Sequence, residues 1–337
     1  MGTVAAREPF VTEEMRKIME DMREILERKA GEVERIVCKW LPEAAGWQHT
    51  VLEAMNYSIL AGGKRLRPML MYEVYRMLGG TGPEIEPLMA AIEMIHTYSL
   101  VHDDLPAMDN DDYRRGRKTT HAVYGEAMGI LAGDGLLNMA WETAMKAFFL
   151  ESPREDSGKN PRENPRKDPR EEAARMRRIA EAVDVLARKA GVYGMIGGQT
   201  ADIEAERASQ ADMEQLLFIH EHKTAALIQA SMMVGAILAG GSERQISQME
   251  KCAYNIGVAF QIQDDILDVT GSMEELGKPI GSDKRNHKQT YVTIRGLKEA
   301  AAEVKRLSGE AEEILSSMEG DSSFLRALTE YLIHRRK

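Results

Sequence analysis

Hydrophobic residues recur at intervals of three and four along several long segments of the chain. In residues 85–102 the positions on one such face are Ile85, Leu88, Met89, Ile92, Ile95 and Tyr98. This is the spacing of one side of an α-helix. Residues 246–267 repeat the spacing, and residues 213–238 consist almost entirely of good helix formers. The pattern predicts an all-α fold.

Two segments depart from this pattern. Residues 290–294 are rich in β-branched side chains and by propensity alone could form a short strand. Without several such runs, however, no sheet can be assembled. Residues 151–172 contain no large apolar side chain and four of the eleven prolines, so they cannot bury a core. We interpret them as a flexible low-complexity insertion in a single domain spanning residues 1–337, with a docking tail for a partner as the alternative.

Composition excludes several classes of protein. A content of 43% hydrophobic residues in 337 is enough for a large core, and a net charge of -10 argues against nucleic-acid binding through a broad basic field. Cys38 and Cys252 alone provide neither a disulfide framework nor a cysteine zinc cluster. The most apolar stretch, near residues 232–239, is far shorter than the roughly 20 residues of a membrane helix. We therefore expect a cytoplasmic protein with no membrane span and no nucleic-acid partner.

Asp103, Asp104 and Asp109 form the first of two acidic motifs, and the basic pair Arg114 and Arg115 follows it. Carboxylates this close together raise one another's pKa unless cations lie among them. On an unbroken helix Asp103 and Asp109 would point about 240° apart, so a shared metal ion requires the helix to end between them. Taken alone, such a cluster is more often a solvated acidic loop.

Asp264, Asp265 and Asp268 form the second acidic motif. Asp264 and Asp268 are one helical turn apart and lie in an otherwise apolar run. Carboxylates there would be costly if buried without a partner, so a cation is expected in front of them. Hard oxygen ligands of this kind suit Mg²⁺. His220 and His222 do not compete as a metal pair, because residues two apart diverge on a helix.

Basic residues cluster locally in spite of the acidic total. The clusters are residues 62–68 (GGKRLRP), Arg114 with Arg115, Lys223, and Lys278. Arginine and lysine bind diphosphates directly, and the GGKR spacing is not that of a P-loop. Each cluster alone is more often a solvated surface. Together with two acidic motifs, they predict Mg²⁺-dependent diphosphate chemistry.

From residue 62 onward the chain resembles the trans-isoprenyl diphosphate synthases. The similar segments are GGKRLRP at 62–68, HTYSLVHDDLPAMDNDDYRRG at 96–116, GGQTADI at 197–203, HKTAALI at 222–228, FQIQDDILDVTG at 260–271 and LGKPIGSD at 276–283. The DDxxxxD form of the first motif is similar to the bacterial short-chain branch, particularly farnesyl diphosphate synthase. The resemblance implies an all-α isoprenoid synthase bundle with a central active-site cavity.

The resemblance also implies the reaction: isopentenyl diphosphate condenses with dimethylallyl and then geranyl diphosphate to give farnesyl diphosphate. Three Mg²⁺ ions, with Mn²⁺ as a substitute, would be held by Asp103, Asp104, Asp109, Asp264, Asp265 and Asp268. The allylic diphosphate would be bound by Arg114, Lys223, Thr224, Gln261 and Lys278. Isopentenyl diphosphate would be bound by Gly63, Lys64, Arg67, His96 and Arg115. The catalytic set is then Asp103, Asp104, Asp109, Arg114, Lys223 and Asp264.

Tyr98 and Ser99 are the residues expected to set product length. Tyr98 precedes Asp103 by five residues, or about 1.4 helical turns, so its ring could close the floor of an apolar tunnel. The alternative is that Tyr98 is simply a core residue. A geranylgeranyl or longer-chain synthase would differ only in tunnel depth.

A class I terpene cyclase and a non-catalytic partner subunit fit the motifs less well. The cyclase usually carries an NSE-type second motif where this chain has DDILD, and such a subunit tends to lose acids from its motifs. The family resemblance further implies a homodimer.

Overall fold

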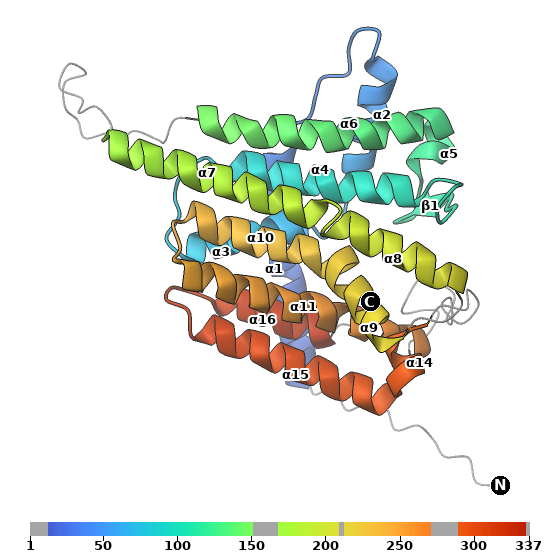
Figure 1. The fold of residues 1–337 in the computed structure, drawn as a ribbon, viewed down its shortest axis with the longest axis vertical. Coiled ribbons are helices and arrows are strands. Elements are labelled where there is room, and N and C mark those ends of the chain that lie inside the picture. The colour runs from blue at the N-terminus through green and yellow to red at the C-terminus, as the bar shows by residue number, and fades with distance from the viewer. Residues whose placement is uncertain (1–12, 151–167, 209–211, 271–288, 335–337) are drawn as a thin grey trace.

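The computed structural model describes residues 13–150, 168–208, 212–270 and 289–334. Within these ranges helices and their connecting loops make up the whole chain except for one small hairpin (Figure 1), so the all-α prediction is confirmed. The first half contains α1 (Glu13–Cys38), α2 (His49–Ile59), α3 (Leu66–Met77), α4 (Ile85–Asp103), β1 (Tyr113–Arg114), β2 (Arg117–Lys118), α5 (Thr120–Tyr124), α6 (Glu126–Met145) and η1 (Lys146–Phe149). The second half contains α7 (Pro169–Ala190), α8 (Met195–Ala208), α9 (Met213–Ile219), η3 (His220–Ala225), α10 (Ala226–Leu238), α11 (Glu243–Thr270), α14 (Tyr291–Arg295), α15 (Leu297–Ser316) and α16 (Ser323–His334).

Most of the long helices lie in stacked rows, from α6 at the top of Figure 1 to α15 at the bottom, and α1 crosses behind them. α4 packs against α6, α10 packs against α3, α7 and α11, and α11 packs against α15. The two acidic motifs lie at or near the C-terminal ends of α4 and α11. The bundle therefore places the start of the first motif and the whole of the second on long, well-packed helices.

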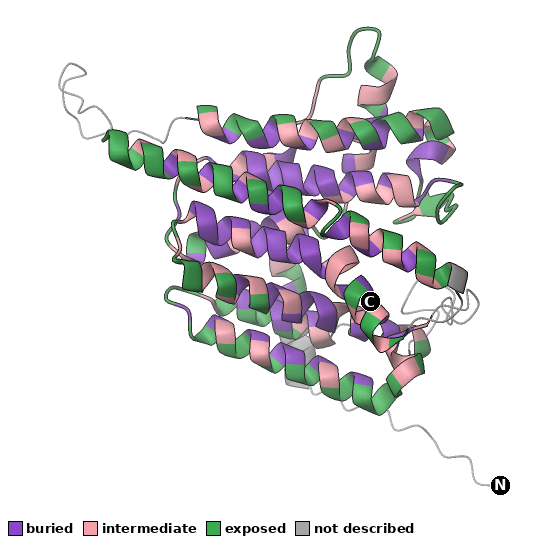
Figure 2. Ribbon diagram, in the orientation of Figure 1, coloured by how far each residue is buried: buried purple, intermediate pink, exposed green. Residues whose placement is uncertain are grey.

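The core is centred on α4 and α10, as Figure 2 shows. Every residue of α10 except Met233 is buried, and α4 is buried along most of its length. A helix that is apolar on all sides belongs in the middle of a large core, and this is where both helices lie. Among the described helices, none has the length and apolarity needed to cross a membrane.

Two segments without clear hydrophobic spacing contain helix in the structure. Residues 290–294 form the start and body of α14, whose N-cap Thr290 makes a capping box with Thr293, so the β-branched run is helical and not a strand. α7 begins at Pro169 behind the N-cap Asp168, so the last four residues of the expected insertion are helical. Residues 151–167 of that insertion lie outside the described residues.

The hairpin of β1 and β2 was not anticipated from the sequence. Arg114 pairs with Arg117, and the two residues between them, Arg115 and Gly116, have φ values of 53° and 75°. Positive φ at both central residues is the geometry of a type I′ turn. The turn comes shortly after the first acidic motif: Arg114 precedes it and Arg115 is its first central residue.

Candidate active site

The first acidic motif folds back on the end of α4. α4 ends at Asp103, and the backbone N–H of Asp109 donates to the carbonyl of Asp103 across 2.8 Å. Asp104 is the C-cap residue, and its carbonyl accepts from the N–H of Asp111 at 3.2 Å. The helix break that a shared site requires is present, and it brings Asp109 back beside Asp103.

Asp103 lies in an electrostatically crowded position. Burial is the main reason that its pKa is raised to about 6; the neighbouring carboxylates of Asp109 and Asp104 act in the same direction, and Lys223 and Arg114 act against them. In these surroundings an added cation would stabilise the ionised form of the carboxyl group. Such an environment is typical of an aspartate that binds a metal ion.

Asp104 and Arg114 form a close ion pair. The Nε atom of Arg114 donates to Asp104 at 2.6 Å, and Asp104 is buried. A terminal nitrogen of Arg114 also lies 3.9 Å from Asp111. Burial raises the pKa of Asp104, while Arg114 lowers it. The structure therefore joins one predicted metal ligand to one predicted diphosphate ligand.

The second acidic motif lies on α11 and its three aspartates do not share one environment. Asp265 is buried, accepts from the backbone N–H of Tyr291 at 2.7 Å, and lies 3.9 Å from the Nε2 atom of His220. It thus links α11 to α14 and η3. Asp264 and Asp268 are half-buried.

Lys223 belongs to η3, a single turn of π-helix between α9 and α10. Its Nζ atom donates to Asp202 of α8 at 2.5 Å. Short π-helical turns are rare and often occur at functional sites. A Cβ atom at Gly198 would collide with the backbone of Lys223, so only glycine allows α8 to approach η3 this closely.

The second basic cluster surrounds the start of α3. Arg67, on α3, is half-buried with its Nε atom inaccessible, and burial lowers its pKa to about 10, helped by Arg115 and opposed by Glu93. Arg115 donates to the carbonyl of Gly62, and a side chain at Gly63 would collide with its guanidinium group. Burial and the neighbouring arginines, Arg67 first among them, lower the pKa of His96. His96 is therefore a neutral imidazole among cations at pH 7.

A cavity of about 380 Å³ is lined by part of the predicted site. Among its lining residues are Arg67, His96, Tyr98, Ser99, Asp103, Lys223 and Thr224 from the predicted set. Its α8 wall consists of Met195, Ile196, Gln199, Thr200 and Ile203. The lining thus combines a few charged groups with a largely apolar surface. The other described residues of the predicted set are not among its lining residues: Gly63, Lys64, Asp104, Asp109, Arg114, Arg115, Gln261, Asp264, Asp265 and Asp268. Lys278 lies outside the described residues.

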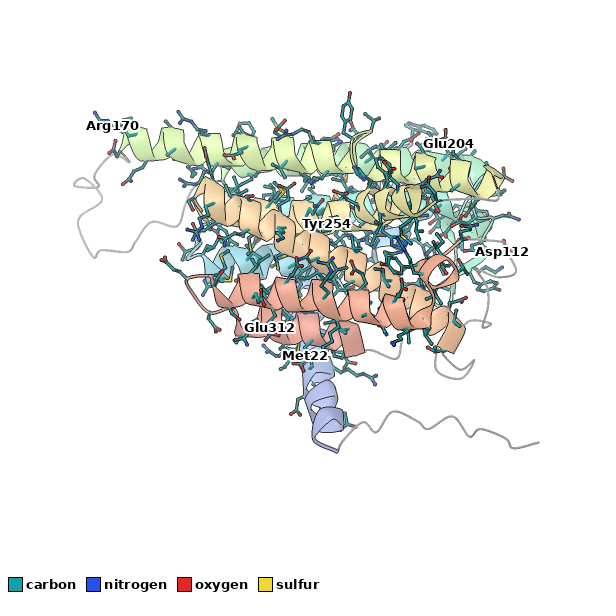
Figure 3. The ribbon with its side chains drawn as sticks, turned by 60° about the horizontal axis from the view of Figure 1, so that its bottom comes forward. Met22, Asp112, Arg170, Glu204, Tyr254 and Glu312 are labelled. Atoms are coloured by element: carbon teal, nitrogen blue, oxygen red, sulfur yellow. The ribbon has the colours of Figure 1, made fainter. Side chains whose placement is uncertain are left out.

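Figure 3 shows which end of the bundle carries this site. Asp112, next to the first acidic motif, and Glu204, on α8 beside the cavity wall, lie toward the same end, whereas Arg170 at the start of α7 lies at the other. The loop after the first acidic motif and the C-terminal half of α8 therefore lie toward the same end of the bundle.

The donor set fits Mg²⁺ in its chemistry. Among the described residues, no three His, Cys, Asp or Glu side chains are placed closely enough to hold a metal ion by themselves. Mg²⁺ commonly binds through one or two carboxylates together with waters and substrate phosphates. Asp103 and Asp109 offer hard oxygen ligands whose mutual repulsion contributes to the raised Asp103 pKa, which a cation would relieve.

Sequence reasoning did not identify three residues that support the site. Asp202 binds Lys223, His220 lies beside Asp265, and Glu93 forms a buried pair with Arg65. Asp202 falls inside the GGQTADI segment, which marked the region without assigning that residue. The other partners are far apart in sequence, and nothing in a single sequence pairs them.

Comparison with known proteins decides the family. Residues 48–322 match the family described as polyprenyl synthetase. The chain belongs to the polyprenyl synthetase family. A chloroplastic geranylgeranyl pyrophosphate synthase of Capsicum annuum is 42% identical over 288 residues, covering 85% of this chain and 72% of that protein. A farnesyl diphosphate synthase of Geobacillus stearothermophilus is 45% identical over 253 residues, covering 74% and 77%.

Solved structures of this family share the fold. The FPP/GFPP synthase of Zymomonas mobilis superimposes with a TM-score of 0.76 at 29% identity, covering 94% of this chain and 99% of that one. The geranyltransferase of Helicobacter pylori, solved with magnesium and isoprenyl diphosphate, gives a TM-score of 0.72 at 29% identity, covering 96% and 98%. This polyprenyl synthetase is accordingly a prenyltransferase of isoprenoid biosynthesis with the isoprenoid synthase bundle.

Proposed function

We propose that this prenyltransferase makes farnesyl diphosphate by Mg²⁺-dependent condensation of isopentenyl diphosphate with dimethylallyl and then geranyl diphosphate. The observation that supports the product length is the position of Tyr98. It is 7% exposed and lines the cavity, about 7.5 Å along the helix axis from Asp103. A phenol ring at that depth would stop a growing chain soon after the metal end of the site.

The residues divide between the two diphosphates. Asp103, Asp104, Asp109, Asp264, Asp265 and Asp268 would hold three Mg²⁺ ions, which would offset the charge that develops on the leaving diphosphate. Arg114 and Lys223 would bind that diphosphate, with Thr224, Gln261 and Lys278 beside it. Lys64, Arg67, His96 and Arg115 would bind isopentenyl diphosphate next to Gly63.

The reaction needs no dedicated side-chain base. The allylic carbon–oxygen bond breaks, the double bond of isopentenyl diphosphate attacks the resulting cation, and the released diphosphate takes the proton that is then lost. The apolar wall from Met195, Ile196 and Ile203 would exclude water, which would otherwise capture the cation. The protein thus contributes charge stabilisation and a dry, shaped cavity.

A geranylgeranyl diphosphate synthase is the second candidate. It is favoured by the 42% identity to the chloroplastic geranylgeranyl pyrophosphate synthase of Capsicum annuum. The two activities differ in the depth of the cavity behind Asp103, so product analysis decides between them.

Labelled isopentenyl diphosphate incubated with dimethylallyl, geranyl or farnesyl diphosphate, with and without Mg²⁺, tests the proposal. We expect farnesyl diphosphate as the end product, no reaction without Mg²⁺, and little extension of farnesyl diphosphate. Accumulation of a twenty-carbon product would support the second candidate, and no condensation with any primer would refute both. Asp103→Asn should lower turnover by several orders of magnitude, while Asp112→Asn, an exposed acid of the same loop, serves as the matched control.

We also propose a cytoplasmic homodimer. Ile130 and Leu131 are 47% and 48% exposed on α6 and form a small apolar patch on that helix. Symmetric dimers bury one shared patch of each subunit about a two-fold axis, and an apolar helix face is suited to that role.

A further inference from the structure

Arg65 and Glu93 form a salt bridge in the interior of the protein. Their side chains are 1% and 3% exposed, and the Nη1 atom of Arg65 donates to Oε1 of Glu93 at 2.6 Å. The Nη2 atom of Arg65 donates to the carbonyl of Ile59, also at 2.6 Å. Removing two charges from water is costly, so a buried ion pair is weak evidence for stability as its purpose. Its position in the fold points to another role.

The pair joins the two segments that carry the isopentenyl diphosphate ligands of the proposed function. Arg65 stands between Lys64 and Arg67 at the start of α3, and Glu93 is one helical turn before His96 on α4. Arg65 also has a φ of 50°, a left-handed conformation that a non-glycine residue keeps only when its surroundings hold it there. The hydrogen bonds from Arg65 to Glu93 and to the carbonyl of Ile59 are two such restraints.

Glu93 is also the buried carboxylate that faces several cations. It raises the pKa of both Arg67 and Arg115, against the lowering effect of burial on each. Glu34 of α1 reaches Arg65 at 3.8 Å but is partly exposed. The Nε atom of Arg67 is buried and has no hydrogen-bond partner among the described residues. Glu93 thus holds together a group of arginines that would otherwise repel one another before an anion is bound.

We infer that Arg65 and Glu93 are positioning residues for isopentenyl diphosphate, fixing the start of α3 against α4 so that Arg67 and His96 line the same cavity and Arg115 stays beside them. The inference rests on the proposed function, because that function assigns the ligand. Neither residue lines the cavity, so each acts through its neighbours.

A double variant separates positioning from stability. Arg65→Met with Glu93→Leu replaces both charges by apolar side chains, a change that leaves many proteins as stable as before. We expect this variant to melt close to the wild type but to show at least a tenfold higher KM for isopentenyl diphosphate, with the KM for the allylic substrate within twofold. Glu93→Asp should recover part of the affinity. Lys29→Met with Glu73→Leu, at the α1 to α3 ion pair, is the matched control and should leave both KM values unchanged.

Direct binding of isopentenyl diphosphate, measured by calorimetry, makes the outcomes distinguishable. A folded double variant that binds isopentenyl diphosphate as tightly as the wild type would overturn the positioning role. A wild-type chain that neither binds nor condenses isopentenyl diphosphate would instead refute the proposed function. If the double variant shows no cooperative melting, Glu93→Asp and Arg65→Lys replace it: each should raise the KM for isopentenyl diphosphate severalfold, and unchanged values would overturn the role.

Discussion

His96 lies among arginines on the inner side of α4, and its titration should be visible in the stability of the substrate-free protein. Burial, then Arg67 and Arg115, lower its pKa below the ordinary value near 6.5. Between the lowered pKa and about 6.5 the unfolded chain therefore binds more protons than the folded one. His96 thus favours folding fully above that window, and its contribution is lost as the pH falls through it.

The measurement is the urea midpoint of the wild type and of His96→Asn at pH 5, 6 and 7. We expect the wild type to lose more stability than the variant between pH 7 and pH 5. Parallel curves for the two proteins would show that the imidazole is not held neutral by its surroundings.

Tyr98 is expected to limit the length of the product. Burial raises the pKa of its hydroxyl to about 12, and its ring packs edge-on against His102 at 5.8 Å. We expect Tyr98→Ala to shift the products toward twenty carbons or more, because it opens the wall of the cavity. Tyr98→Phe keeps the ring and should keep the product. Chromatography of the dephosphorylated products is the measurement, and an unchanged chain length in the alanine variant would remove Tyr98 as the floor.

Single residues also show what a sequence can and cannot reveal. The six motif aspartates, Lys223 and Arg114 could be proposed as ligands because their types and order are typical of diphosphate chemistry. Asp202 and Glu93 could not, because they act through partners 21 and 28 residues away. Nor could the sequence show that Asp265 is buried and accepts a hydrogen bond from the backbone N–H of Tyr291, whereas its neighbour Asp264 is only half-buried.

The π-helical turn η3 lies in close contact with two helices, α8 and α11. Gly198 of α8 lies against the backbone of Lys223, and Gly257 of α11 lies against Ala225. Both glycines allow neighbouring helices to approach the turn that carries Lys223 and Thr224. The position of these two side chains is therefore set by helix packing on both sides.

Gly198→Ala should consequently impair activity. The added methyl group collides with backbone atoms, which cannot rotate away, so η3 must move. We expect turnover to fall by at least tenfold, with a loss of stability of about 1–3 kcal/mol. Gly309→Ala, on α15 with open space around it, is the control and should be neutral or slightly stabilising by up to about 1 kcal/mol. Turnover and thermal melting are the measurements, and equal activity of both variants would contradict this packing role.

The helices themselves could be predicted because apolar spacing is a direct record of which face is buried. α4 and α11 were located in this way. The hairpin at β1 and β2 was missed because each strand has two residues, too few for any alternation to be read. The propensity of residues 290–294 left a short strand open, and the capping box at Thr290 with packing of α14 against α15 determines their helical form.

We expect the whole molecule to assemble as a homodimer. A homodimer should elute with twice the mass of the 37.7 kDa chain in size-exclusion chromatography with light scattering. Leu131→Asp should shift it toward the monomer, because a buried unpaired charge is costly at an apolar contact. Glu142→Gln, another exposed position of α6, is a control that should remain dimeric. A monomeric wild type at micromolar concentration would contradict the assignment.

The π-helical turn also has a consequence for which length changes the chain can tolerate. Compared with an uninterrupted α-helix, the segment from α9 through α10 contains one surplus residue, which is accommodated at η3. Deleting one residue there would let the helix wind regularly, with α9 and α10 still facing their present neighbours. The fold should accept this deletion, but Lys223 and Thr224 would turn away from the cavity, so the shortened protein should still unfold cooperatively and yet be inactive.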